Sequence, residues 1–250
     1  MRRHILITGG SSGIGAGIAQ IAASYGYKIT ICGLESEDEM TANITSLDEA
    51  GAGSVSYYQC DLTDGMAARD FIKQAAAAMG HLDVLVNNAG MQHVSPIDEF
   101  DSAAWDKVIA LNLSAAFHTS AAALPMMRAQ NWGRIINIAS VHGLVASVNK
   151  AAYVAAKHGL IGLTKTIALE TANSQITCNA ICPGWVKTPL VQAQITARAS
   201  ASGQSVEDEA RQLVSEKQPK ADFVTPEQIG EMVHYLASDK ADMITGAQMV

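Results

Sequence analysis

Short apolar runs alternate with longer segments of helical periodicity along most of the chain. The runs that predict strands are 5–8, 28–32, 55–59, 84–87, 134–138, 177–181 and 247–250. Between them, apolar residues recur at i, i+3 and i+4, which predicts helices over 14–25, 67–79, 103–130 and 153–170. This alternation is typical of βαβ units. It predicts a doubly wound α/β fold, in which one seven-stranded parallel sheet carries helices on both faces.

One long segment, residues 187–224, interrupts this alternation. It has no strand pattern and is rich in Ala, Gln and Ser. A helix is expected directly after it, because Thr225 suits an N-cap, Pro226 the first turn and Gln228 a capping box. A connection of this length inside one domain is usually functional. We therefore expect a single domain over 1–250 with a lid-like helical insertion at about 187–224.

Composition and charge narrow the class of partner. The chain has 250 residues, of which 48% are hydrophobic and 16% charged, so it can bury the core of one domain. Its formal net charge of −7 disfavours binding to nucleic acid or anionic membranes. There is no signal-peptide pattern, no apolar run of about 18 residues and no metal-spaced cysteine pair. We expect a cytoplasmic protein without a metal, acting on a small molecule.

A glycine-rich loop follows the first predicted strand and opens the first predicted helix. It reads Thr8-Gly9-Gly10-Ser11-Ser12-Gly13-Ile14-Gly15. Glycines let the backbone approach a pyrophosphate closely, and a helix N-terminus faces its negative charge. A glycine cluster can also be a simple tight turn. Its place between strand and helix favours a dinucleotide site.

A second group of residues suits the oxidation of an alcohol. Tyr153 and Lys157 are four residues apart on one predicted helix, so they project from the same face, and Ser140 ends the fifth predicted strand. Such a Tyr–Lys pair alone is also common on solvated helix surfaces. The chemistry requires a base for the hydroxyl proton, and a phenol can serve if a neighbouring positive charge lowers its pKa. We expect Lys157 to supply that charge, together with the cationic nicotinamide of an oxidised cofactor.

Together with Asn87-Asn88-Ala89-Gly90, these motifs resemble the short-chain dehydrogenase/reductase family. The resemblance implies a Rossmann-type fold and a catalytic set of Asn112, Ser140, Tyr153 and Lys157, in which Asn112 holds a water that links Lys157 to solvent. It also implies that the cofactor contacts lie at the carboxyl ends of strands. These are Gly9, Ser11, Ser12, Gly13, Ile14, Gly15, Leu34, Asp61, Leu62, Asn88, Ala89, Gly90, Tyr153, Lys157, Pro183, Gly184, Val186 and Thr188.

Two of these cofactor assignments leave alternatives open. Asp61 can serve equally as a simple cap. The turn after the second strand, Gly33-Leu34-Glu35-Ser36-Glu37, contains no basic residue for the extra phosphate of NADP, which favours NAD. Glu35 could accept hydrogen bonds from ribose hydroxyls. However, NAD-specific family members usually carry an aspartate at the strand end, where this chain has Gly33, so direct contact by Glu35 stays open.

Four polar residues near the predicted catalytic group suit an anionic substrate: Gln92, His142, Lys150 and Gln194. Each alone could be a solvated loop residue. The stretches 139–147, 153–159, 178–186, 216–219 and 223–228 resemble those family members that oxidise short 3-hydroxy acids. The implied reaction is the reversible oxidation of (R)-3-hydroxybutyrate to acetoacetate with NAD. The implied substrate contacts are Gln92, Ser140, His142, Lys150, Tyr153, Trp185 and Gln194.

Other functions remain as alternatives. Within the family, the chain could be a 3-oxoacyl thioester reductase or a sugar alcohol dehydrogenase. From another class, it could be a non-catalytic dinucleotide sensor, although the presence of Tyr153 and Lys157 argues against this. The resemblance implies a homotetramer with the helices 103–130 and 153–170 at its interface. Because Gln194 lies in the long insertion, we expect it to reach the substrate only when the lid closes.

Overall fold

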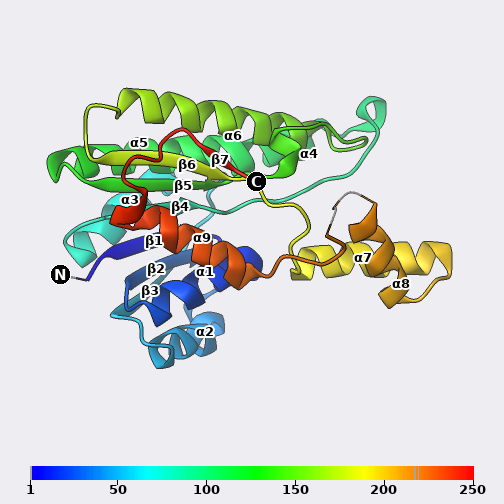
Figure 1. The fold of residues 1–250 in the computed structure, drawn as a ribbon, viewed down its shortest axis with the longest axis horizontal. Coiled ribbons are helices and arrows are strands. Elements are labelled where there is room, and N and C mark those ends of the chain that lie inside the picture. The colour runs from blue at the N-terminus through cyan, green and yellow to red at the C-terminus, as the bar shows by residue number, and fades with distance from the viewer. Residues whose placement is uncertain (1, 217, 219) are drawn as a thin grey trace.

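The computed structural model describes residues 2–216, 218 and 220–250 (Figure 1). Seven parallel strands form one sheet in the order β3-β2-β1-β4-β5-β6-β7, which confirms the predicted fold class. Each predicted strand overlaps an observed strand, and its first and last residues lie within three residues of the observed ends. The observed bounds are β1 His4–Thr8, β2 Lys28–Gly33, β3 Ser54–Gln59, β4 Val84–Asn87, β5 Gly133–Ile138, β6 Ile176–Ile181 and β7 Gln248–Met249.

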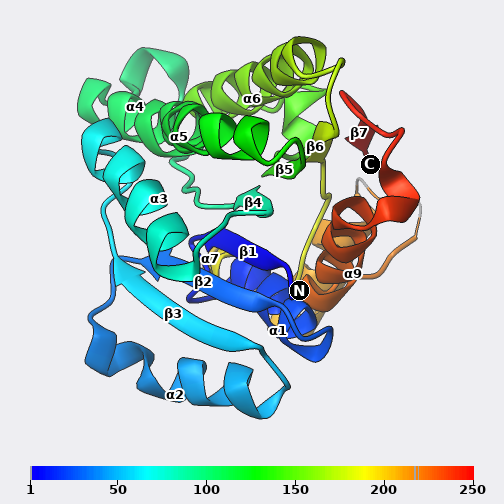
Figure 2. The ribbon, with the colours of Figure 1, turned by 90° about the vertical axis from the view of Figure 1, so that its left-hand side faces the viewer.

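Helices cover both faces of the sheet, as Figure 2 shows. One face carries α1 (Gly13–Ser24), α2 (Glu37–Glu49) and α9 (Pro226–Ala237), and the other carries α3 (Gly65–Met79), α4 (Ser102–Ile109), α5 (Ala115–Ala129) and α6 (Ala151–Glu170). Successive residues of β1 enter different cores: Ile5 and Ile7 pack towards α1 and α9, and Leu6 packs towards α3 and α5. Both faces of the sheet are therefore buried beneath helices, as a parallel sheet requires.

Helix α2 is absent from the sequence prediction. Only Met40 and Leu47 are buried on it, so it lacks the broad apolar stripe that marks a core helix. Its start does carry a local signal, because Ser36 and Glu39 form a capping box. Short 3-10 turns at Ile97–Glu99, Val141–Gly143 and Asp239–Ala241 complete the connections.

The single helix predicted over 103–130 is interrupted. Between α4 and α5, residues Ala110–Ser114 form a π-helical turn that carries Asn112, a feature often found at functional sites. By length and composition alone, the combined segment Ser102–Ala129 could cross a membrane, a test that a buried core helix also passes. Here it packs within the fold, and the hydroxyl of Thr119 donates to Asn87 Oδ1 at 2.6 Å.

The insertion forms two helices, α7 (Pro189–Ser202) and α8 (Val206–Ser215), which stand beyond one end of the sheet (Figure 1). At its base, Val186 and Val224 form a parallel bridge. Between the two helices, Arg198 Nε donates to the buried carboxylate of Glu209 at 3.1 Å. Helix α9 then begins with the expected capping box of Thr225 and Gln228.

Candidate active site

Two adjoining cavities lie at the carboxyl edge of the sheet. Strands β1 and β4 are neighbours there, and their following connections run to opposite faces, which is where open α/β sheets bind ligands. The larger cavity has a volume of about 530 Å³ and the smaller of about 360 Å³. Ile14, Ala139, Tyr153 and Thr188 line both cavities, so a ligand in one can meet a ligand in the other.

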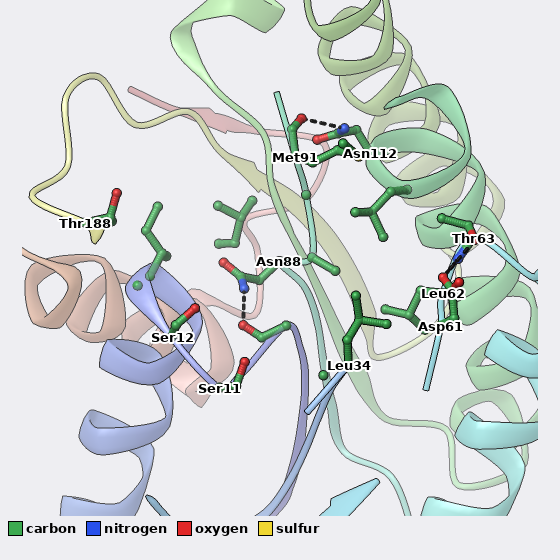
Figure 3. Close-up of a pocket in the computed structure, with 18 of the residues that line it drawn as sticks. Ser11, Ser12, Leu34, Asp61, Leu62, Thr63, Asn88, Met91, Asn112 and Thr188 are labelled. Atoms are coloured by element: carbon green, nitrogen blue, oxygen red, sulfur yellow. Dashed lines mark hydrogen bonds between the residues drawn. The ribbon is translucent and has the colours of Figure 1, made fainter. Parts of the chain in front are cut away.

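Most of the predicted cofactor residues line the larger cavity (Figure 3). They are Gly9, Ser11, Ser12, Gly13, Ile14, Leu34, Asp61, Leu62, Asn88, Ala89, Gly90, Tyr153, Lys157 and Thr188. Pro183, Gly184 and Val186 line the smaller cavity instead. Thr63, Lys107 and Leu111 also line the larger one, and sequence reasoning missed them because they belong to no recognisable motif.

The glycine loop has the shape that a pyrophosphate site requires. Gly9 and Gly13 have φ values of 62° and 54°, in the left-handed region that favours glycine. The Asn88 amide donates to the carbonyls of Thr8 and Gly9 at 2.9 Å each, which fixes the loop to the end of β4. Ser12, the N-cap of α1, makes no side-chain capping bond, so its helix start can accept an anion.

Gly15 lies outside the lining of both cavities. A Cβ at this position would collide with the carbonyl of Gly9 and the side-chain amide of Asn88. Its role in this structure is to let α1 start close to the loop. It therefore shapes the site without facing it.

Asp61 has the contacts expected of a cap and also a place in the larger cavity, the two interpretations left open by the sequence. One carboxylate oxygen accepts from the backbone N–H and the hydroxyl of Thr63, at 2.9 and 2.7 Å (Figure 3). These bonds hold the pKa of Asp61 below its ordinary value. The residue thus caps a turn and also lines the larger cavity.

Glu35 turns back over the end of β2. Ser11 Oγ donates to Glu35 Oε1 at 2.9 Å, and the Tyr57 hydroxyl donates to the Glu35 carbonyl at 2.6 Å. A Cβ at Gly33 would collide with Glu35 Oε2, which means that this carboxylate occupies the space of a strand-end side chain. Oε2 is buried and has no hydrogen-bond partner among the described residues. The structure thereby supplies an acidic group at the cavity wall where the sequence has glycine.

Lys157 and Asn112 lie together beneath the larger cavity. Lys157 is 3% exposed, and its ammonium donates to the Ile138 carbonyl at 2.8 Å. Burial lowers the pKa of Lys157 to about 8. Asn112 donates to the carbonyls of Met91 and Val108, while its buried Oδ1 finds no partner in the described part of the chain. Such an orphaned oxygen fits the bound water implied by the family resemblance.

Burial dominates the pKa of Tyr153 in this structure. The Lys157 ammonium is 5.6 Å from the centre of the Tyr153 ring. Burial nevertheless raises the pKa of Tyr153, and a hydrogen bond with Ser140 opposes that rise only in part. Lys157 donates to the Ile138 carbonyl, so desolvation dominates the pKa of Tyr153 here, and the lowering expected from Lys157 together with an oxidised nicotinamide stays a prediction.

The smaller cavity brings together every predicted substrate residue. Its lining includes Gln92, Ser140, His142, Lys150, Tyr153, Trp185 and Gln194. These residues come from the loops after β4, β5 and β6, from the starts of α6 and the 3-10 turn, and from α7. Sequence reasoning missed the apolar members of the lining, Val141, Val145, Ala146 and Val191, and also Gln218.

Polar groups in this cavity are already oriented. Gln194 Nε2 donates to Gln92 Oε1 at 3.2 Å, and the Lys150 ammonium lies 5.7 Å from the centre of the Trp185 ring. Gln194 thus already faces the cavity in this structure, and its dependence on lid closure stays a prediction. The backbone N–H of His142 donates to Ser140 Oγ at 3.1 Å.

No metal chemistry is supported by the described ranges. Within residues 2–216, 218 and 220–250, no group of three or more His, Cys, Asp or Glu side chains is placed to hold an ion. Cys32, Cys60, Cys178 and Cys182 are free thiols. Burial raises the pKa of each thiol.

A dinucleotide cradle joined to a Ser–Tyr–Lys pocket defines an oxidoreductase of the doubly wound class. The family model described as short chain dehydrogenase matches residues 3–199, and the chain belongs to this family. Members of the family bind a nicotinamide dinucleotide. The glycine loop and the uncapped start of α1 both fit such a cofactor.

Relatives and solved structures agree with this assignment. The chain is 50% identical over 243 residues to D-beta-hydroxybutyrate dehydrogenase of Cupriavidus necator, covering 97% of this chain and 93% of that protein. It is 45% identical over 249 residues to D-beta-hydroxybutyrate dehydrogenase of Rhizobium meliloti, covering 100% and 96%. The structure of an actinorhodin polyketide ketoreductase with NADPH matches with a TM-score of 0.92 and 32% identity, covering 99% and 95%.

Proposed function

We propose that this protein catalyses the reversible oxidation of (R)-3-hydroxybutyrate to acetoacetate with NAD. The observation that carries the proposal is the smaller cavity, in which donors suited to a carboxylate face the predicted catalytic hydroxyls. Lys150 supplies a positive charge, and Gln92, His142 and Gln194 supply directed hydrogen bonds. The two relatives named as D-beta-hydroxybutyrate dehydrogenase support this substrate class.

The reaction needs the chain mainly for orientation and for proton handling. Ser140 and Tyr153 hold the substrate hydroxyl. Tyr153 takes the proton of that hydroxyl as hydride leaves the carbon that bears it. When held by the residues of the larger cavity, an oxidised nicotinamide dinucleotide would supply the hydride acceptor and a positive charge. The Lys157 ammonium lies 5.6 Å from the centre of the Tyr153 ring, and a water that donates to the Asn112 oxygen left unpartnered by the described residues would connect Lys157 to solvent and carry the proton away.

The preference for NAD rests on Glu35. Its unpartnered carboxylate oxygen lies at the wall of the larger cavity, over Gly33, and Ser11 fixes the other oxygen. A ribose hydroxyl can donate to that oxygen, whereas the extra phosphate of NADP would be repelled by it. The ketoreductase structure with NADPH makes this choice worth testing directly.

The test of cofactor choice is direct binding. NADH should bind wild-type protein at least about tenfold more tightly than NADPH, since one buried repulsion of this kind is worth roughly 1–3 kcal/mol. Glu35→Gln should narrow the ratio without changing protein stability. Exposed Glu37→Gln is the matched control and should leave the ratio unchanged. Equal affinities in the wild type would contradict the assignment.

The test of the reaction is NADH formation, followed by its near-ultraviolet absorbance. We expect turnover with NAD and (R)-3-hydroxybutyrate, little with the (S) enantiomer, and little with a 3-hydroxybutyryl thioester or a sugar alcohol. Turnover of the thioester in preference to the acid would favour a 3-oxoacyl thioester reductase. Binding of NADH without turnover of any of them would favour a sensor.

We also propose a cytoplasmic homotetramer with α5 and α6 at its interface. These helices leave large apolar side chains exposed, including Phe117 at 47% and Leu169 at 79%. Such side chains favour burial against another subunit. Light scattering coupled to size exclusion should give four times the 26.3 kDa chain mass. Phe117→Glu should dissociate the assembly, and a wild-type monomer would contradict the proposal.

A further inference from the structure

Gln218 lies between α8 and α9 and lines the substrate cavity, although no motif points to it. Its backbone N–H donates to the Val214 carbonyl at 3.0 Å, which continues the end of α8. Its side-chain Oε1 accepts from the backbone N–H of Trp185 at 2.6 Å, and its Nε2 donates to the Asp222 carbonyl at 3.0 Å. One amide thus joins the end of the insertion to the loop after β6.

The loop after β6 is held by the Gln218 contact together with two backbone hydrogen bonds to Val224. The Trp185 carbonyl accepts from the Val224 N–H at 3.0 Å, and the Lys187 N–H donates to the Val224 carbonyl at 2.9 Å. The backbone of Trp185 is therefore held on both sides, by Gln218 at its N–H and by Val224 at its carbonyl. The side chain of Trp185 projects into the cavity, with the Lys150 ammonium 5.7 Å from its ring centre.

Gly184 provides the space for the same contact. A Cβ on Gly184 would collide with Gln218 Oε1. A side chain at position 184 would therefore displace the Gln218 amide from its place beside Trp185. Gln218, Gly184 and the N–H of Trp185 form one packed unit, which we call the Gln218 clamp.

We propose that Gln218 is a positioning residue for substrate binding. It fixes the Trp185 backbone, and thereby places the indole that borders the substrate and faces Lys150. It touches neither the reacting atoms nor the dinucleotide loop. The proposal rests on the proposed function in one respect only, because the substrate used to measure KM is 3-hydroxybutyrate.

Kinetics give the first test, with Gln218→Ala and the exposed Gln212→Ala on α8 as its matched control. Loss of Gln218 leaves a backbone N–H without its acceptor, which we expect to raise KM for 3-hydroxybutyrate about tenfold. The turnover number should change less than about threefold, and the Kd for NADH less than about twofold. A KM equal to that of the control, or equal losses in KM, turnover and NADH binding, would overturn the proposal.

A double-mutant cycle gives the second test. Gly184→Ala displaces the Gln218 amide without removing it, so it should raise KM as Gln218→Ala does. Once the amide is displaced, its removal should add little, and the two effects should be strongly non-additive. Additive effects would show that the two residues act separately and would overturn the clamp.

Hydrogen exchange keeps the inference separate from the identity of the substrate. The Trp185 amide should exchange at least about tenfold faster in Gln218→Ala than in wild type or Gln212→Ala, whatever the substrate is. If wild-type protein does not oxidise 3-hydroxybutyrate but this exchange difference appears, the proposed function fails and the clamp stands. An unchanged exchange rate would overturn the clamp alone.

Discussion

The two edges of the same sheet differ in where their buried polar groups lie: those at the amino edge pack within the fold, and those at the carboxyl edge line a cavity. At the amino edge, the buried ring of His4 bonds through one nitrogen to the His81 carbonyl at 2.6 Å and through the other to Thr30 Oγ1 at 2.8 Å. Trp132 lies between two guanidinium groups, with Arg3 and Arg134 at 4.4 and 4.3 Å from its ring centre. Both ring nitrogens of His4 therefore have protein partners, and the two guanidinium groups pack on Trp132, contacts that stabilise the fold.

At the carboxyl edge, several polar atoms have no partner in the described part of the protein. Asn112 Oδ1 and Glu35 Oε2 are buried and unpaired, and both residues line the larger cavity. Arg134 Nε and Thr177 Oγ1 are also unpaired, near the opposite edge, but neither residue lines a cavity described here. An unpaired group beside a cavity indicates binding, and the comparison predicts that variants at the two edges affect different measurements.

The largest expected effect separates activity from stability at the carboxyl edge. Tyr153→Phe should reduce turnover at least about 10³-fold, because positioned acid–base catalysis contributes a factor of this size. The Kd for NADH and the midpoint of thermal unfolding should stay close to wild type. Steady-state kinetics, NADH titration and calorimetry measure the three quantities.

The matched control is Tyr27→Phe. The hydroxyl of Tyr27 lies 3.3 Å from His234 Nδ1, away from both cavities. This variant should lower the free energy of unfolding by about 1 kcal/mol and leave turnover unchanged. If Tyr153→Phe reduced NADH binding as strongly as turnover, the phenol would be structural and the contrast between the edges would fail.

The next effect concerns pH and the amino edge. Burial lowers the pKa of His4 from 6.5 to about 4 in the folded protein, so the unfolded chain binds more protons between these pH values. The stabilisation from neutral His4 is fully present above pH 6.5 and is lost as the pH falls to 4. The loss should amount to about 3 kcal/mol.

Urea unfolding at a series of pH values measures this loss. His4→Gln should flatten the pH dependence between 6.5 and 4, although it lowers stability at neutral pH. The exposed His158→Gln is the control and should keep the wild-type dependence. A dependence that survives in His4→Gln would assign the acid sensitivity to other groups.

The third effect returns to the carboxyl edge and to the substrate. Lys150→Ala should raise KM for 3-hydroxybutyrate about 10- to 100-fold, as expected for one charge-assisted contact to a carboxylate. The rise should be smaller for an uncharged 3-hydroxybutyrate ester. Lys165→Ala, an exposed lysine on α6, should change neither value. Equal losses for acid and ester would remove Lys150 from the carboxylate site.

The contrast between the edges also explains what could be predicted from sequence. Strands, the glycine loop and the Tyr153–Lys157 pair follow from local patterns, because parallel strands bring their carboxyl ends to one edge. The bonds of Ser11 to Glu35, of the Trp185 N–H to Gln218 and of Asn112 to the Met91 carbonyl join segments that are distant in the sequence. No periodicity or spacing encodes them. The effect of burial on the pKa of Tyr153 depends on packing that only the structure shows.

The smallest effect lies at the exposed rim of the amino edge. Arg3 pairs with Asp239 at 2.5 Å, but the Asp239 side chain is 76% exposed and water screens the pair. Asp239→Asn should lower the free energy of unfolding by only about 0.5 kcal/mol, and the difference should shrink at high salt. Arg3 keeps its bond to the Ala237 carbonyl and its stacking on Trp132. Urea unfolding at low and high salt measures this, and a salt-independent loss above about 2 kcal/mol would show that the rim is as essential as the buried His4 network.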